Sequence, residues 1–105
     1  MAYVKFILWA KSLPNGKCHV YCKGGIHYWC DMSLRDIIRA NRGYGLLKIH
    51  QSWFININFI SKRHVFNLWI VTLNDGKILT RLVVCRDMRR DYETNFKKVF
   101  TEVKI

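Results

Sequence analysis

Apolar residues alternate with polar ones along most of the chain, and turn residues separate the alternating runs. Residues 3–10, YVKFILWA, are β-branched and aromatic and predict a strand that is apolar on both faces. Residues 13–17, LPNGK, predict a tight turn. Residues 17–22 and 26–30 then alternate around a Lys-Gly-Gly turn and predict a second hairpin. The first third of the chain is therefore expected to be antiparallel β.

The apolar period becomes helical at residues 33–39, SLRDIIR. Ser33 can cap a helix and Asp36 follows three residues later, so the sequence predicts a short helix here. Residues 61–66 and 68–73 predict a hairpin through Asn67, and an Asn-Asp-Gly turn predicts a further hairpin that leads into residues 77–84. Trp9, Trp29 and Trp69 are expected to anchor the core from strands.

A C-terminal helix is predicted from Asp87, which can act as its N-cap. Apolar residues recur after it near helical spacing, at Met88, Tyr92, Phe96, Val99 and Phe100. With 105 residues the chain is long enough for one hydrophobic core and too short for two, so a single domain is expected.

Residues 46–60, LLKIHQSWFININFI, form an apolar run that is interrupted by His50, Gln51 and Ser52. The apolar residues after the interruption are expected in the core: Trp53, Phe54, Ile55 and Ile57. His50 has two readings, as a structural histidine that orders a loop or as a residue that contacts a ligand. Asn56 is expected to bind the backbone of its own loop.

The charge of the chain indicates the kind of partner that it binds. Lys and Arg number 18 against seven Asp and Glu, which gives a net charge of +11 and a field suited to a polyanion. The basic residues are scattered through turns, unlike those of a membrane-binding amphipathic helix, so nucleic acid is the expected partner. No apolar stretch approaches the roughly 18 residues of a membrane span, and no signal peptide is recognisable, so a cytoplasmic protein is expected.

The sequence contains no clear motif for cofactor binding or catalysis. The spacing of Cys18, Cys22 and Cys30 with the nearby histidines matches no tight zinc knuckle, so free thiols and no cofactor are expected. A nucleophile pair from Cys85 and His50 requires an assumed proximity, and there is no Gly-rich phosphate loop. The protein is therefore not expected to be an enzyme.

Residues 48–60, KIHQSWFININFI, together with Asp75-Gly76-Lys77 and Cys85-Arg86, resemble the LytTR family of DNA-binding domains of bacterial transcriptional regulators. The resemblance spans almost the whole chain, so residues 1–105 are expected to form one such domain without a receiver domain. It implies a mainly β fold with short helices: three small antiparallel sheets in an elongated stack, and a C-terminal helix. It also implies binding to double-stranded DNA through loops inserted in the major groove.

The family pattern places three DNA-contacting loops at residues 11–17, at residues 50–52 and at Cys85-Arg86. Gln can pair with adenine and Arg with guanine, and the base-contacting residues implied by the resemblance are Gln51, Arg86, Asn15 and His50. Residues suited to phosphate contacts are Lys11, Lys17, Ser52, Arg63 and Arg89. The segment between Gly76 and Cys85 is longer than the family pattern, so Arg81 is an alternative base reader to Arg86.

The resemblance further implies imperfect direct repeats as targets, with a monomer in solution that pairs on DNA in association with the nucleoid. Two alternatives stay open. An RNA or single-strand binder would stack bases on exposed tyrosines, of which the sequence offers Tyr3, Tyr21, Tyr28 and Tyr44. A protein-interaction module is the other alternative, and Met1 favours a whole protein over a fragment.

Overall fold

The computed structural model describes residues 6–64 and 67–103, with side chains as far as Lys97. Its strands and helices are β1 (Ile7–Ser12), β2 (Cys18–Cys22), β3 (His27–Cys30), α1 (Leu34–Ala40), β4 (Leu46–His50), β5 (Trp53–Asn56), β6 (Ile70–Asn74), β7 (Leu79–Val83) and α2 (Arg89–Val103). Within these ranges, neither helix is long and apolar enough to cross a membrane.

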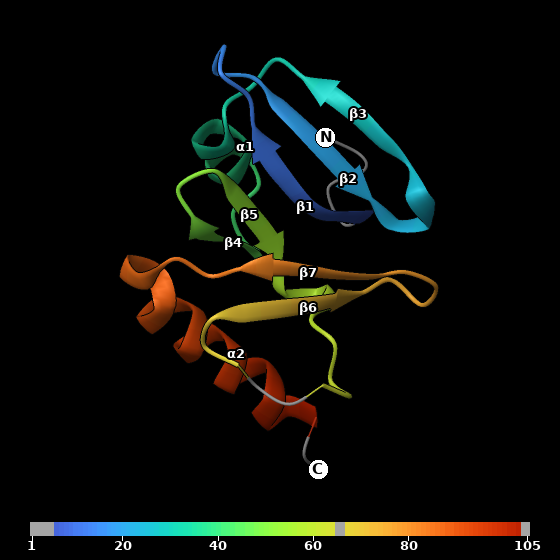
Figure 1. Ribbon diagram of the computed structural model, residues 1–105, viewed down its shortest axis with the longest axis vertical. Helices are drawn as coiled ribbons and strands as arrows, with labels where there is room; N and C mark the ends of the chain where they lie inside the picture. The colour runs from blue at the N-terminus through green and yellow to red at the C-terminus, as the bar shows by residue number, and fades with distance from the viewer. Residues whose placement is uncertain (1–5, 65–66, 104–105) are drawn as a thin grey trace.

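The strands form two antiparallel sheets, which Figure 1 shows stacked above α2. The larger sheet has the order β3-β2-β1-β5-β4, and the smaller one pairs β6 with β7. The molecule is elongated, 40 by 30 by 23 Å. These features confirm the predicted fold class. The described residues form two sheets where the resemblance implied three, because β1 pairs with both β2 and β5 and so joins two hairpins into one sheet.

Strand β5 of the larger sheet is buried on both faces. Phe54 of β5 packs in a core with Leu34 and Ile37 of α1, whereas the next residue, Ile55, packs in a second core on the opposite face. Successive side chains of a strand point to opposite faces, so apolar neighbours along β5 require a cover on each side. Helix α1 supplies one cover, and β6, β7 and α2 supply the other (Figure 1).

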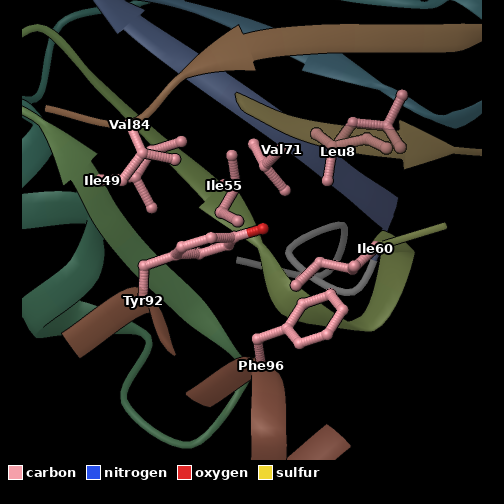
Figure 2. Close-up of a cluster of buried hydrophobic side chains, with 9 residues drawn as sticks. Leu8, Ile49, Ile55, Ile60, Val71, Val84, Tyr92 and Phe96 are labelled. Atoms are coloured by element: carbon pink, nitrogen blue, oxygen red, sulfur yellow. The ribbon is translucent and has the colours of Figure 1, made fainter. Parts of the chain in front are cut away.

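Helix α2 closes the second core. Figure 2 shows Tyr92 and Phe96 reaching from α2 toward Ile49, Ile55 and Ile60. The two rings lie one helical turn apart on one face, as the predicted spacing requires. Burial raises the pKa of Tyr92 to about 12, so its phenol stays protonated at neutral pH.

Asn56 ties the end of β5 to β1 and to its own loop. Its side-chain Nδ2 donates to the carbonyl oxygen of Ile7 (2.9 Å), and its Oδ1 accepts from the backbone N–H of Asn58 (3.0 Å). A Cβ at Gly45, where φ is +85°, would lie 2.7 Å from the side-chain Nδ2 of Asn58, so only glycine fits beside the Asn56 and Asn58 side chains. The expected role of Asn56 in its own loop is confirmed.

Asp75 joins the tip of the β6–β7 hairpin to the turn between β2 and β3. Its Oδ1 accepts from the backbone N–H groups of Ile78 (2.7 Å) and Lys77 (2.9 Å), and its Oδ2 accepts from that of Gly24 (3.1 Å). The bonds from Ile78 and Lys77 are the main cause that lowers the pKa of the Asp75 carboxyl below its ordinary value. One buried carboxylate therefore links the two sheets.

The short helix and the strand-turn order are confirmed, including the Ser33 cap, whose hydroxyl accepts from the Asp36 N–H (3.2 Å). The strand expected at residues 61–66 is wrong for residues 61–64, which form a turn, and residues 65 and 66 lie outside the described ranges. In that turn the Ser61 hydroxyl bonds His64 Nδ1 (2.6 Å), so side-chain bonds replace strand pairing. Helix α2 begins at Arg89, after a 3-10 turn over Arg86–Met88 that contains Asp87.

The tryptophans only partly match expectation. Trp9 is half-buried against the second core, but Trp29 is 68% exposed and Trp69 is 61% exposed. Trp29 lies on β3, an edge strand with no cover on that face, and Trp69 precedes β6. The expectation that both residues anchor the core is wrong, because Trp29 lies on an edge strand and Trp69 lies outside any strand.

Replacing Asn56 with alanine should lower the free energy of unfolding by about 1–3 kcal/mol, since the Ile7 carbonyl oxygen would be buried without its donor. Urea unfolding measures this change. Asn95→Ala is the matched control, because that amide bonds only within α2 and its loss should cost about 0.5 kcal/mol or less. Equal losses in the two variants would contradict the role given to Asn56.

Acid should destabilise the wild-type protein through Asp75. The ionised carboxylate stabilises the fold above its ordinary pKa of about 3.9, and this contribution is lost as the pH falls through the lower folded value. Asp75→Asn should therefore be less stable at neutral pH and should lose less stability from about pH 5 downward. Measuring the free energy of unfolding across this pH range tests the prediction, with Asp31→Asn, at an exposed carboxyl, as control. The same pH dependence of stability in the wild type and Asp75→Asn would exclude a contribution from ionised Asp75.

Candidate nucleic-acid interface

Three loops meet at one edge of the molecule and are joined by hydrogen bonds. The backbone N–H of Ser12 donates to the carbonyl oxygen of Ser52 (2.7 Å), and that of Cys85 donates to the carbonyl oxygen of Ile49 (2.8 Å). Residues 11–17, 50–53 and 84–89, called the three-loop edge below, therefore lie side by side, at the left in Figure 1. The turn between β4 and β5 is the middle loop and is held from both sides.

His50 orders the middle loop. Its Nδ1 accepts from the backbone N–H of Ser52 (3.0 Å), and its ring stacks on that of Trp53, with 3.7 Å between centroids and 10° between planes. Because Nδ1 accepts, the neutral ring carries its proton on Nε2. The loop-ordering reading of His50 is thus confirmed. Gln51 lies in the turn and is exposed.

The third loop carries Arg86, which is exposed in the 3-10 turn before α2. Arg81 lies five residues earlier in β7, opposite Thr72, outside the three-loop edge. Cys85, the residue before Arg86, is thus bonded to the end of β4, whereas Arg81 lies within the β6–β7 pairing. Trp53 adds a further link, because its Nε1 donates to the carbonyl oxygen of Val83 (2.9 Å).

Arg89 has a partner that sequence reasoning missed. Its guanidinium carbon lies 3.2 Å from the centroid of the Trp69 ring, and its Nε is buried without a hydrogen-bond partner. A guanidinium over an indole face is a cation–π contact, which fixes the start of α2 against the segment that enters β6. Sequence spacing gave no signal for this pair, because the residues are 20 positions apart.

The first loop is shaped by Asn15. Its Oδ1 accepts from the backbone N–H of Lys17 (3.1 Å), and the N–H of Leu13 donates to the carbonyl oxygen of Lys17 (2.8 Å). Lys17 forms an ion pair with Asp31 (3.2 Å), but both side chains are largely exposed, so the pair contributes little. Lys11 is exposed on β1, where it lies opposite Trp53 of the middle loop.

Arg63 is not brought to this edge. It is exposed in the turn after Ile60, and this segment lies below the smaller sheet, on the side away from the three loops (Figure 1). Of the predicted contact residues, the three-loop edge therefore gathers Lys11, Asn15, Lys17, His50, Gln51, Ser52, Arg86 and Arg89.

A row of aromatic rings crosses the larger sheet on the face opposite α1. Trp9 stacks on Tyr21 (4.4 Å between centroids), Tyr21 stacks on His19 (4.3 Å), and His19 lies 4.1 Å from Trp29. The rings cover one another, so the row offers few free faces for nucleobases. Burial, with His27 as the next cause, lowers the pKa of His19 and favours its neutral form.

The tyrosines expected to stack on a single strand do not share a surface. Tyr21 is in the row of rings, Tyr28 is half-buried against the α1 core, and Tyr44 is exposed in the segment between α1 and β4. Tyr3 lies outside the described residues. This distribution differs from the continuous exposed sheet surface that single-strand binding would use.

The cysteines are separated from the histidines by the sheet. Cys18 and Cys22 point into the α1 core, whereas His19 points to the opposite face. Among residues 6–64 and 67–103, no three possible metal ligands come together. Burial, with Cys30 nearby, raises the pKa of the Cys18 thiol to about 11, so this thiol is protonated at neutral pH.

Comparison with known proteins supports the fold assignment. No family model matches the chain, and no curated protein matches it by sequence. Among solved structures, the LytTr DNA-binding domain of a DNA response regulator from Bacillus cereus superposes with a TM-score of 0.69. The two chains are 13% identical, and the match covers 88% of this chain and 82% of that one. The likeness confirms the predicted resemblance at the level of structure: this protein has the fold of a LytTr-type domain.

Proposed function

We propose that this protein binds double-stranded DNA in a sequence-specific manner through the three-loop edge and acts as a transcriptional regulator. The observation that carries the proposal is the pair of backbone bonds, Ser12 to Ser52 and Cys85 to Ile49, which aligns the three loops. A net charge of +11 supplies the attraction for a polyanion. The similar Bacillus cereus domain is itself described as DNA-binding.

Each loop has a distinct task in this proposal. Gln51 projects from the middle loop and reads adenine, and Arg86 projects from the third loop and reads guanine. Asn15 in the first loop offers its remaining amide group to a base edge. His50 holds the middle loop through Nδ1 and directs its Nε2 proton toward the groove. The base readers thus stand on a hydrogen-bonded frame, which lowers the entropy lost on binding.

Phosphate contacts fix the register of the protein on DNA and add affinity without reading sequence. Lys11 and Lys17 flank the first loop and are exposed, and the hydroxyl of Ser52 belongs to the middle loop. Arg89, at the start of α2 and three residues after Arg86, keeps its aromatic contact and offers its guanidinium to a phosphate. Contacts of this kind would orient Gln51 and Arg86 over the bases.

In the cell, this domain would bind DNA in the cytoplasm without enzymatic activity, associated with the nucleoid when bound. The proposed targets are imperfect direct repeats, each repeat taking one copy of a chain that is monomeric in solution. The exposed Trp29 at the edge of the larger sheet favours one alternative, binding of single strands by stacking, although its neighbours cover one another's rings.

Binding-site selection from a random duplex library tests the proposal, run beside competition with single-stranded DNA and RNA of equal length. A recovered duplex motif with repeated half-sites is the expected result. A preference for single strands would indicate that the protein binds nucleic acid by stacking bases on the aromatic row. The absence of any motif would exclude sequence-specific recognition.

Gln51→Ala should relax the preference at one base position and weaken the selected duplex by about 1–3 kcal/mol, because one bidentate contact is lost. Affinity for random duplex should stay nearly unchanged. Fluorescence anisotropy on both duplexes measures the difference, with Asn95→Ala as the control amide on α2. Equal losses on the selected and random duplexes would remove Gln51 from the base readers.

A further inference from the structure

Four basic side chains surround a hollow that lies outside the three-loop edge. Arg35 and Arg39 belong to α1, Arg42 follows its C-cap, and Lys48 comes from β4. Together with Ile38 they line a depression of about 280 Å³. Arg35 and Arg39 lie at i and i+4 on the solvent face of α1, and Arg42 lies in the turn after the helix.

The charges of this cluster are not balanced by the protein. In the part of the chain that the structure describes, ion pairs join Lys17 to Asp31 and Lys97 to Glu93, and none involves the four residues of the hollow. Like charges at i and i+4 oppose helix formation, so folding alone does not favour this arrangement. An anion bound between the side chains would remove that repulsion.

The chemistry of the cluster points to phosphate. A guanidinium fork matches two oxygens of a phosphate group, and three of the four cations are arginines. At about 280 Å³ the hollow is at the lower end of the pockets that enclose a small organic ligand, and it is an open depression instead of an enclosed cavity. It is therefore better suited to successive phosphates of a chain that lies across it than to a free ligand held inside.

Its position also fits a DNA backbone. Lys48 lies three residues before Gln51, which is about 10 Å along a strand. Figure 1 shows α1 and the turn between β4 and β5 at the same side of the larger sheet. Backbone phosphates follow one another every few ångströms along each DNA strand, so a duplex at the middle loop passes near the hollow.

We propose that Arg35, Arg39, Arg42 and Lys48 form a second phosphate-binding surface that holds the DNA backbone beside the segment read by the three loops. This inference rests on the proposed function, and it lengthens the DNA site beyond the bases that the loops reach. The contacts are independent of sequence, so they act on random duplex as well as on a selected site.

The salt dependence of duplex binding tests the surface. Four to six neutralised phosphates give the wild-type protein a slope of log affinity against log salt of about −4 to −5. Arg35→Gln with Arg39→Gln should make the slope shallower by about 1.8, because each lost phosphate contact removes about 0.9. The matched control, Arg63→Gln with Lys77→Gln, removes two exposed charges remote from α1 and should leave the slope unchanged.

Lys48→Gln provides a second variant on a strand, with an expected change of about 0.9 in slope. Circular dichroism establishes that each variant is folded. Equal slopes for the α1 variant and the wild type would overturn the inference, as would an equal change in the α1 and control variants. The two proposals can fail separately. If the wild type selects no motif, but only the α1 variant has a shallower salt slope on random duplex, the proposed sequence-specific function is wrong and the phosphate-binding surface is supported.

Discussion

The structure depends on one constraint, which is that β5 is apolar on both of its faces. Phe54 and Ile55 are both fully buried, and they point to opposite sides of the larger sheet. A sheet with two apolar faces needs two covers. The second cover is the β6–β7 hairpin with α2, and its placement carries the end of β7 to the end of β4. The three-loop edge is thus a consequence of core packing.

The same constraint explains why polar residues interrupt an apolar segment. His50 ends β4 and pairs with Trp53, and Gln51 and Ser52 form the turn that joins β4 to β5. The His50 ring accepts from the loop backbone and stacks on Trp53, and Trp53 in turn bonds the end of β7 through Val83. Two of the polar residues therefore build the loop or connect it, and Gln51 is left exposed.

Much of the fold could be predicted from local patterns. Short-range signals gave the capped helix at Ser33 and the turn at Asp75, because capping and turn bonds join residues within a few positions of one another. The strand expected at residues 61–66 failed for residues 61–64, where side-chain bonds such as that between Ser61 and His64 compete with pairing. Trp29 was misjudged because a sequence does not say which strand lies at an edge.

For the site, the sequence by itself determined the residue types: a basic chain, an exposed Gln51 in a turn, and a resemblance that singled out the loops. Only the tertiary structure decided which of them meet. It joined the loops through Ser12 and Cys85, with Arg86 directly after Cys85 and Arg81 within the β6–β7 pairing, and it left Arg63 in a separate turn. The physical reason is that local sequence encodes turns and strand faces, whereas the contacts between loops come from how two sheets pack on a shared core.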